Sequence, residues 1–117
     1  MVSILGISAF YHDSAAAILV DGKIIAAAQE ERFSRLKHDS EFPKNAIQFV
    51  LKQANIQLSD VDHIVFYEKP FLKFHRLLKT YLSIAPNGYQ SFLKSIPLWT
   101  KKKIFQKKMI FNELKKI

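Results

Sequence analysis

The residues best suited to chemistry in this chain of 117 residues are His12 and Asp13, two adjacent ionisable side chains between two apolar runs. An imidazole titrates near neutral pH, so a histidine held in a turn can take a proton from an attacking hydroxyl group. Adjacent residues of an extended segment point to opposite sides, so we expect Asp13 to cap the turn or bind a cation rather than to orient His12. The alternative is an ordinary hairpin in which both residues are structural.

A second group of candidate residues lies in the polar segment from Glu30 to Phe42, which is dense in charge and has no apolar period. Cations clustered beside acids can bind an anion, and Arg35 and Lys37 are the candidates for contacting a phosphate or a carbonyl oxygen. A loop of this length in a compact domain is typically functional or mobile. The alternative is a solvated charged loop.

The remaining ionisable residues predict no self-sufficient metal or nucleotide site. His63 opens an apolar run and His75 falls in a helical pattern, so we interpret both as structural. Glu68 and Lys69 end a predicted strand, where ligand-facing residues often lie, although ordinary salt bridges are the commoner explanation. The sequence contains no H-x-x-x-H, H-E-x-x-H, P-loop or G-x-G-x-x-G pattern.

The elements that must position these residues begin with three predicted strands. Residues 2–8 and 14–20 are apolar runs typical of short strands, and residues 23–29 follow an Asp-Gly pair that favours a two-residue hairpin turn. Three strands joined by tight turns form an antiparallel meander. The meander would place His12 and Asp13 in the turn between its first two strands.

A crossover helix and a fourth strand are predicted next. Pro43 stands at the first helical position, which tolerates proline, and the following apolar residues have the spacing of an amphipathic helix. These residues are Ile47, Val50, Leu51 and Ala54. A strand over residues 62–67 follows, and the helical crossover makes it parallel to the first strand. The pattern predicts an α/β fold, a partial actin-like lobe of the ribonuclease-H-like type.

Beyond Pro70 the pattern predicts a helical insertion. Apolar residues keep a helical period until a break at residues 85–88. A short helix is predicted over residues 89–96, and a third helix, opened by Pro97, over residues 98–117.

The net charge of +8 is unevenly distributed. Residues 1–68 contain nine acids and six bases, whereas residues 69–117 contain twelve bases and the single acid Glu113. Such asymmetry is typical of a nucleic-acid or membrane patch, or of a basic half that packs on an acidic surface. The lysines alternate with large apolar residues, so we favour a solvated or partner-facing helix face over a nucleic-acid or membrane partner. We expect residues 1–69 to form an α/β half-lobe and residues 70–117 a basic helical extension of the same domain.

The absence of cysteine excludes a disulfide framework and a thiolate metal site, and it fits a reducing cytoplasm. The first residues lack the basic start and long apolar core of a secretory signal. No apolar run approaches the roughly 20 residues that a membrane span needs. We therefore expect a soluble, cytoplasmic protein.

Three motifs follow one another along the chain: ILGISAFYHDSAAA at residues 4–17, QEERFSRLKHD at residues 29–39 and FPKNAI at residues 42–47. Together with residues 60–74 they closely resemble the N-terminal region of the O-carbamoyltransferases. That family includes nodulation-factor carbamoyltransferases and antibiotic-tailoring enzymes. Three separated motifs in the same order make the resemblance specific, and it extends over essentially the whole chain.

The resemblance implies an actin-like domain, similar to the tRNA-threonylcarbamoylation protein Kae, that precedes a smaller YrdC-like domain. In the family the smaller domain makes carbamoyl-adenylate from carbamoyl phosphate and ATP, and the actin-like domain transfers the carbamoyl group to an acceptor hydroxyl. The resemblance therefore implies that His12 lies next to the acceptor hydroxyl and Lys37 near the activated carbamoyl group. Asp13 and Arg35 are then candidates for binding substrate beside them.

Family members continue to an H-x-x-x-H segment that supplies iron ligands, and then to the second domain; neither occurs in these 117 residues. We therefore expect no metal site and no cofactor in this chain, with ATP and iron belonging to the full-length family. We expect the chain to be a fragment that is inactive alone and that has a complementing C-terminal half as its partner. Carbamoyl phosphate and a hydroxyl acceptor are the substrates that the family resemblance implies. The alternative is a non-catalytic interaction module whose basic helices bind a partner protein, nucleic acid or an anionic membrane.

Overall fold

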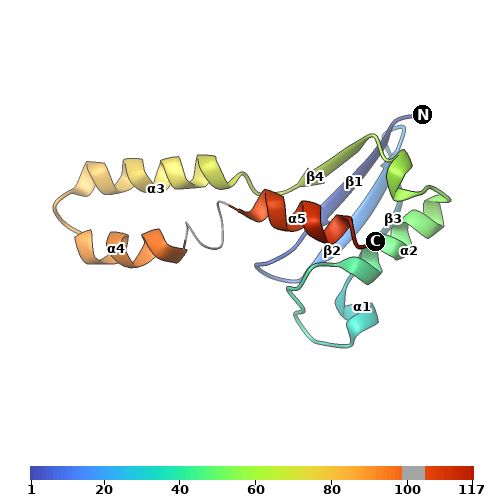
Figure 1. The fold of residues 1–117 in the computed structure, drawn as a ribbon, viewed down its shortest axis with the longest axis horizontal. Coiled ribbons are helices and arrows are strands. Elements are labelled where there is room, and N and C mark those ends of the chain that lie inside the picture. The colour runs from blue at the N-terminus through green and yellow to red at the C-terminus, as the bar shows by residue number, and fades with distance from the viewer. Residues whose placement is uncertain (99–104) are drawn as a thin grey trace. The chain divides into compact units, whose positions relative to one another are not determined.

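The computed structural model describes residues 1–98 and 105–117 (Figure 1). The described residues have a mixed α/β structure with a four-stranded sheet and five α-helices. They divide into two compact units, residues 1–67 with 115–117, and residues 68–114. The first unit contains the sheet, and the helices and strands described in the second unit are all α-helices.

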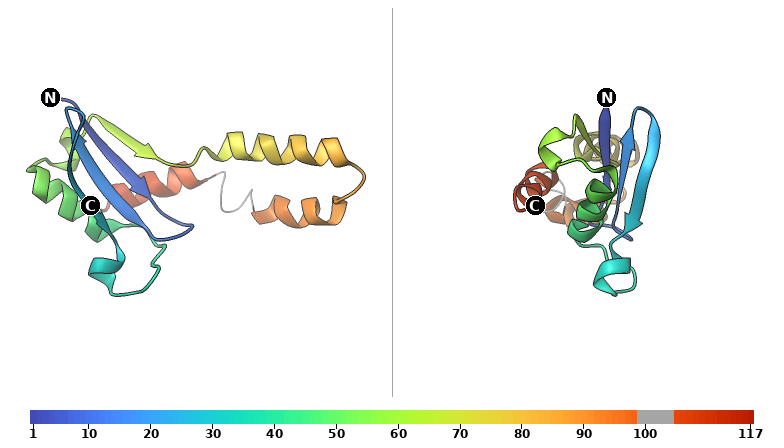
Figure 2. Two further views of the ribbon diagram at one scale, coloured as in Figure 1. Left: turned by 180° about the vertical axis from the view of Figure 1, so that it is seen from behind. Right: turned by 90° about the vertical axis from the view of Figure 1, so that its right-hand side faces the viewer.

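The sheet has the strand order β3-β2-β1-β4. Its strands are β1 (Ser3–Ser8), β2 (Ala15–Val20), β3 (Lys23–Gln29) and β4 (His63–Phe66). β2 pairs antiparallel with both β1 and β3, whereas β4 pairs parallel with β1. The predicted meander and the parallel fourth strand are therefore confirmed, and the strands can be followed side by side in Figure 2.

The turn between β2 and β3 has the predicted two-residue form. Asp21 and Gly22 both have positive φ, at 48° and 78°. Asp21 also accepts a hydrogen bond at Oδ1 from the backbone N–H of Val2, over 2.7 Å. An Asp-Gly pair suits this turn because both residue types tolerate the left-handed backbone.

The core of the first unit lies between the sheet and helix α2 (Lys44–Ala54), which packs on β2 and β3. Alternate strand residues face the helix, because successive side chains of a strand point to opposite faces. The buried apolar residues are Leu5, Ile7, Ala16 and Ile18 from the strands and Ala46, Ile47, Val50 and Leu51 from the helix. Figure 2 shows α2 on one side of the sheet. The helix begins one residue later than predicted, because Pro43 has ψ 61°, outside the helical range.

The start of α2 is fixed by Glu30, whose side chain is 3% exposed. Its Oε1 accepts hydrogen bonds from the backbone N–H of Asn45 at 3.2 Å and from Asn45 Nδ2 at 2.6 Å. Its Oε2 accepts one from the backbone N–H of Ala46 at 2.8 Å. A carboxylate in this place satisfies N–H groups that have no partner within the helix, and it complements the positive end of the helix dipole.

The polar segment was predicted to be a loop throughout. Its first residues instead form a one-turn helix, α1 (Glu31–Ser34). The backbone N–H groups of Phe33 and Ser34 donate to the carbonyl oxygen of Glu30, at 2.9 and 3.0 Å. The turn ends at Arg35, where φ is 61°. A helix of one turn has no long face to bury, so no apolar period announces it.

The second unit contains α3 (Pro70–Ile84), α4 (Tyr89–Leu98) and α5 (Gln106–Leu114). The predicted break after α3 is confirmed. The rings of Tyr81 in α3 and Phe92 in α4 stack across it, with centroids 4.1 Å apart. None of the helices in the described ranges is both long and apolar enough to cross a membrane.

The prediction that Pro97 opens a third helix is wrong, because Pro97 lies inside α4 (Tyr89–Leu98). The predicted third helix, residues 98–117, includes α5, whereas its residues 99–104 lie outside the described residues.

Replacing Glu30 should destabilise the first unit. We expect Glu30→Gln to lower the free energy of unfolding by about 1–2 kcal/mol and Glu30→Ala by about 2–4 kcal/mol, because buried N–H donors lose a charged acceptor. Urea unfolding followed by circular dichroism measures both. Glu41→Gln is the control, since Glu41 is an exposed carboxyl residue of the same segment. Equal stability of the Glu30 and Glu41 variants would contradict the role given to Glu30.

Asp62 should make stability depend on pH. Hydrogen bonds from the backbone N–H and hydroxyl of Ser3, at 2.8 and 2.9 Å, lower the pKa of this carboxyl group below 3.8. A carboxyl group whose pKa is lower in the folded state stabilises that state when ionised, and the contribution is lost as the pH falls. The stability difference between the parent and Asp62→Asn should therefore be constant above about pH 5 and shrink below about pH 4. Asp60→Asn, in urea titrations over the same range, is the control.

Candidate functional site

The candidate site is a corner of the first unit, defined here as residues 9–14, between β1 and β2, with residues 30–42, which include α1. Three residues of the corner have left-handed backbone conformations: Phe10 (φ 71°), Arg35 (φ 61°) and His38 (φ 56°). Such conformations are uncommon outside glycine, and they persist only where the surrounding structure holds them. The corner is thus a place where contacts override local backbone preference.

Hydrogen bonds join the two segments of the corner. The backbone N–H of Phe10 donates to the carbonyl oxygen of Ser40 at 2.7 Å. Ser14 is buried and donates twice to the carbonyl oxygen of Asp39, from its N–H at 2.7 Å and from Oγ at 3.0 Å. The rings of Phe10 and Phe42 also stack, with centroids 6.3 Å apart. These contacts hold the β1–β2 turn against the end of the polar segment.

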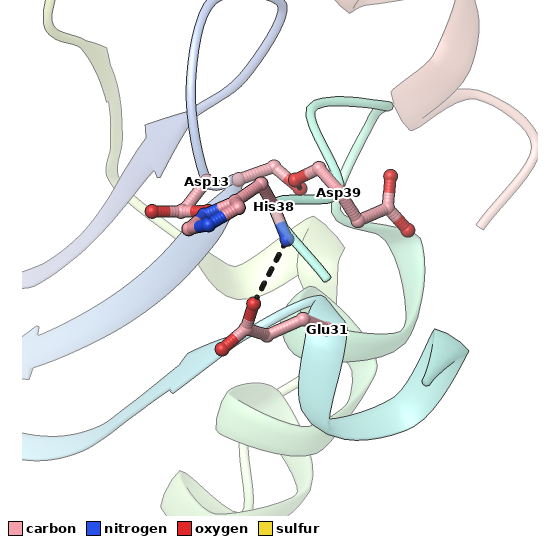
Figure 3. Close-up of polar contacts among 5 residues, drawn as sticks. Asp13, Glu31, His38 and Asp39 are labelled. Carbon is pink, nitrogen blue, oxygen red and sulfur yellow. Dashed lines mark hydrogen bonds and ion pairs between the residues drawn. The ribbon is translucent and has the colours of Figure 1, made fainter. Parts of the chain in front are cut away.

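A side-chain pair extends this junction toward solvent (Figure 3). His38 Nδ1 lies 2.8 Å from Asp13 Oδ1, with side-chain exposures of 70% and 36%. The backbone N–H of His38 donates to Oε2 of Glu31 at 3.1 Å. A carboxylate is only an acceptor, so a hydrogen bond between the side chains of His38 and Asp13 requires a proton on Nδ1 of the His38 ring.

Asp39 stabilises the same segment through its side chain. Hydrogen bonds from the Ser34 hydroxyl and the Glu41 backbone N–H lower the pKa of the Asp39 carboxyl group below 3.8. The bond from Glu41 N–H to Asp39 Oδ1 measures 3.0 Å. Asp39 therefore favours its ionised form and closes a local turn after His38.

The structure distributes the four predicted site residues over both segments of the corner. His12 is exposed in the β1–β2 turn, and its ring packs edge-on against Tyr11 with centroids 4.2 Å apart. Lys37 is exposed in the polar segment, and Arg35 forms the C-cap of α1. Of these four residues, Asp13 contacts the other segment directly, because its side chain lies against that of His38.

His38 is a site residue that the sequence did not single out. Its partner Asp13 is 25 positions away, so no local spacing connects them. Instead of capping its own turn, the Asp13 carboxylate contacts the polar segment. The one available signal was the position of His38 beside Lys37 in the charged motif of residues 29–39.

Asp13, Glu31 and His38 could together hold a divalent cation. One ligand atom from each lies within 4.8 Å of the others, and imidazole nitrogen and carboxylate oxygen are ligand types that zinc and non-haem iron accept. The trio is not the H-x-x-x-H pair that the family resemblance implies for iron, and the chain has no glycine-rich phosphate loop for ATP. The residues present therefore do not match the sites implied for either group.

A groove of about 750 Å³ lies over the sheet beside α1. Its floor consists of small residues of three strands, Gly6, Ser8, Ala15, Ala17 and Ala27, and its margin includes Arg32, Phe33, Phe49 and Tyr67. A Cβ atom built on Gly6 would meet only the carbonyl oxygen of Ala17, at 3.8 Å, which is ordinary contact. The groove has the volume of a small-molecule site.

Comparison with known proteins identifies the family. Residues 3–117 match the family model described as carbamoyltransferase N-terminus. The chain belongs to this family. The resemblance found in the sequence is thereby confirmed, over nearly the full length of the chain.

Three relatives of this carbamoyltransferase N-terminal chain are informative. An uncharacterized protein of Synechocystis, sll1178, is 53% identical over 114 residues, which cover 97% of this chain and 18% of that protein. Nodulation protein NolNO of Sinorhizobium fredii is 48% identical over 58 residues, 50% of this chain and 8% of that protein. An uncharacterized 19.2 kDa protein of Rhizobium etli is 45% identical over 60 residues, 51% of this chain and 35% of that protein. The chain thus spans about a third or less of each relative.

Removing the Ser14 hydroxyl should loosen the corner. In Ser14→Ala the carbonyl oxygen of Asp39 keeps one of its two hydrogen bonds from residue 14, so the polar segment should open more often. We expect trypsin to cut after Arg35 or Lys37 about two- to tenfold faster. Ser59→Ala is the matched control, because Ser59 Oγ bonds only its neighbour Asp60 at 3.2 Å. Equal cleavage rates for parent, variant and control would contradict the proposed junction.

Proposed function

We propose that this chain is the N-terminal part of an O-carbamoyltransferase that transfers a carbamoyl group from carbamoyl phosphate, through carbamoyl-adenylate, to an acceptor hydroxyl. The observation that carries the proposal is the match of residues 3–117 to the carbamoyltransferase N-terminus family. The strand order β3-β2-β1-β4, with an antiparallel meander and a parallel fourth strand, supports an actin-like lobe as its architecture.

In the proposed reaction the corner serves the transfer step. His12 is exposed, so its ring can meet an acceptor hydroxyl and take its proton. The acceptor oxygen then forms a bond to the carbamoyl carbon, the bond from that carbon to the adenylate phosphate oxygen breaks, and AMP leaves. Lys37 would stabilise the negative charge that develops on the carbamoyl oxygen, with Arg35 as a further cation beside the phosphate.

The activation step would depend on sequence beyond the matched segment. This chain spans 18% of the Synechocystis relative. The chain also lacks the H-x-x-x-H segment that the resemblance implies for iron, and it contains no P-loop. We therefore propose that the isolated chain does not complete the reaction and that it acts together with the remaining parts of a carbamoyltransferase.

The alternative of a basic interaction module has weaker support. Its support is the uneven charge of the sequence, whereas the family match includes the basic half as well as the α/β half. Transfer is therefore the better-supported function.

His12→Ala should abolish transfer without affecting carbamoyl activation. The test replaces the matched segment of the Synechocystis relative by this chain, so that the relative supplies the remainder of a family member. Two reactions are followed: pyrophosphate release from ATP that depends on carbamoyl phosphate, and transfer of labelled carbamoyl to a panel of monosaccharides, chitooligosaccharides and aminoglycosides. We expect His12→Ala to reduce transfer about 10²- to 10⁴-fold, because the general base is lost, and to leave pyrophosphate release unchanged.

His63→Ala is the matched control, because His63 is also exposed but lies at the start of β4. It should retain transfer. Normal transfer by His12→Ala would refute the role of His12, and a parent chimera that neither releases pyrophosphate nor transfers carbamoyl would refute the proposed function.

A further inference from the structure

The Asp13–His38 pair lies between the two segments that carry the proposed transfer residues. Asp13 follows His12 in the chain, and His38 follows Lys37. The 2.8 Å contact between Asp13 and His38 therefore brings the neighbours of both transfer residues together. We propose that Asp13 and His38 are a positioning pair, which holds the β1–β2 turn and the polar segment closed so that His12 and Lys37 reach one substrate. This inference rests on the proposed function.

The backbone junction alone does not fix this end of the polar segment. Its hydrogen bonds reach Asp39 and Ser40, which come after Lys37 and His38 in the chain. Toward the exposed end, His38 is held by the Asp13 side chain and by the bond from its N–H to Glu31. These two contacts also account for the left-handed backbone of His38, at φ 56°, which a non-glycine residue does not adopt without support.

The exposure of the pair separates a positioning role from a structural one. The two side chains are 70% and 36% exposed, and exposed ion pairs contribute little to global stability. Cutting the pair should therefore leave the thermal unfolding of the chain nearly unchanged. A loss of transfer in such a variant would then reflect the placement of groups in the corner rather than unfolding.

Asparagine at position 38 offers a sharp test. Its side-chain Nδ2 stands where Nδ1 of histidine stands and can donate to Asp13, and asparagine tolerates left-handed backbone conformations. Alanine keeps neither property. If His38 positions the segment, His38→Asn should behave like the parent and His38→Ala should not.

The first experiment uses this chain alone and does not depend on activity. Trypsin should cut after Lys37 about two- to fivefold faster in Asp13→Ala and in His38→Ala, the range for loss of an exposed pair. The double variant should add nothing further, because both changes remove one bond. His38→Asn should be protected like the parent, and Glu41→Gln serves as the control. Parent-like cleavage of both alanine variants would overturn the proposal.

The second experiment measures the ring of His38 by nitrogen-15 NMR. A bond to Asp13 predicts a protonated Nδ1, and the signal should lose that signature in Asp13→Ala. The competing possibility is a cation held by Asp13, Glu31 and His38. The nitrogen-15 spectra are therefore also recorded while zinc chloride is added. Micromolar zinc binding that removes the Nδ1 proton in the parent, and is lost in Glu31→Gln, would overturn the pair in favour of a metal site. Retention of the proton in zinc supports the pair.

The third experiment uses the chimera described for His12. His38→Ala should lower kcat for transfer about 10- to 100-fold, with pyrophosphate release unchanged, because a small displacement of reacting groups costs rate in this range. His38→Asn should restore most of that loss. If His38→Asn does not restore transfer although its polar segment is protected from trypsin, the His38 ring itself takes part in the chemistry, and the positioning role is overturned. If the parent chimera neither releases pyrophosphate nor transfers carbamoyl, but the trypsin and NMR experiments give the expected results, the proposed function is refuted and the Asp13–His38 contact is still supported.

Discussion

The structure of the first unit depends on Glu30, the residue that directly follows β3. Its backbone N–H donates to the carbonyl oxygen of Ser14 at 2.9 Å, and its own carbonyl oxygen accepts the first bonds of α1. Its carboxylate, buried, accepts three hydrogen bonds at the start of α2. One residue therefore sets the turn, the short helix and the long helix relative to one another, because a buried carboxyl group must keep its hydrogen-bond donors.

That constraint explains why the corner can hold strained backbone near solvent. The base of the corner is made of buried groups, Ser14 and Glu30, whose polar atoms are paired. The exposed end, around His38, is held by only two side-chain contacts. The proposed transfer residues His12 and Lys37 lie at this exposed end. A buried base with an exposed end would suit the proposed transfer site, which a substrate must enter and leave.

The strands and α2 were predictable because their signals are local. Apolar alternation, the Asp21-Gly22 turn and the spacing of Ile47, Val50 and Leu51 each identify an element within a few residues. The crossover rule then fixes the direction of β4. His12, Asp13 and Lys37 were found as candidates from residue type and family resemblance, and the structure adds that their segments are joined.

The missed features have long-range or marginal causes. The bond between Asp13 and His38 joins residues 25 positions apart, and Glu30 resembles any other charge of the polar segment until α2 is placed beside it. α1 is too short to show a period, and Pro97 was predicted to open a helix because proline is found at helix starts more often than inside helices. Only the folded arrangement distinguishes a capping carboxylate from a solvated one.

The open floor at Gly6 makes the sheet accessible to spectroscopy. An added Cβ there meets nothing closer than 3.8 Å, and the chain contains no cysteine. A single cysteine in place of Gly6 would therefore be a unique attachment point for a fluorescent or spin label inside the groove. Whatever molecule or polypeptide enters the groove would change the mobility of that label, so occupancy of this face can be followed in real time even while the occupant is unidentified.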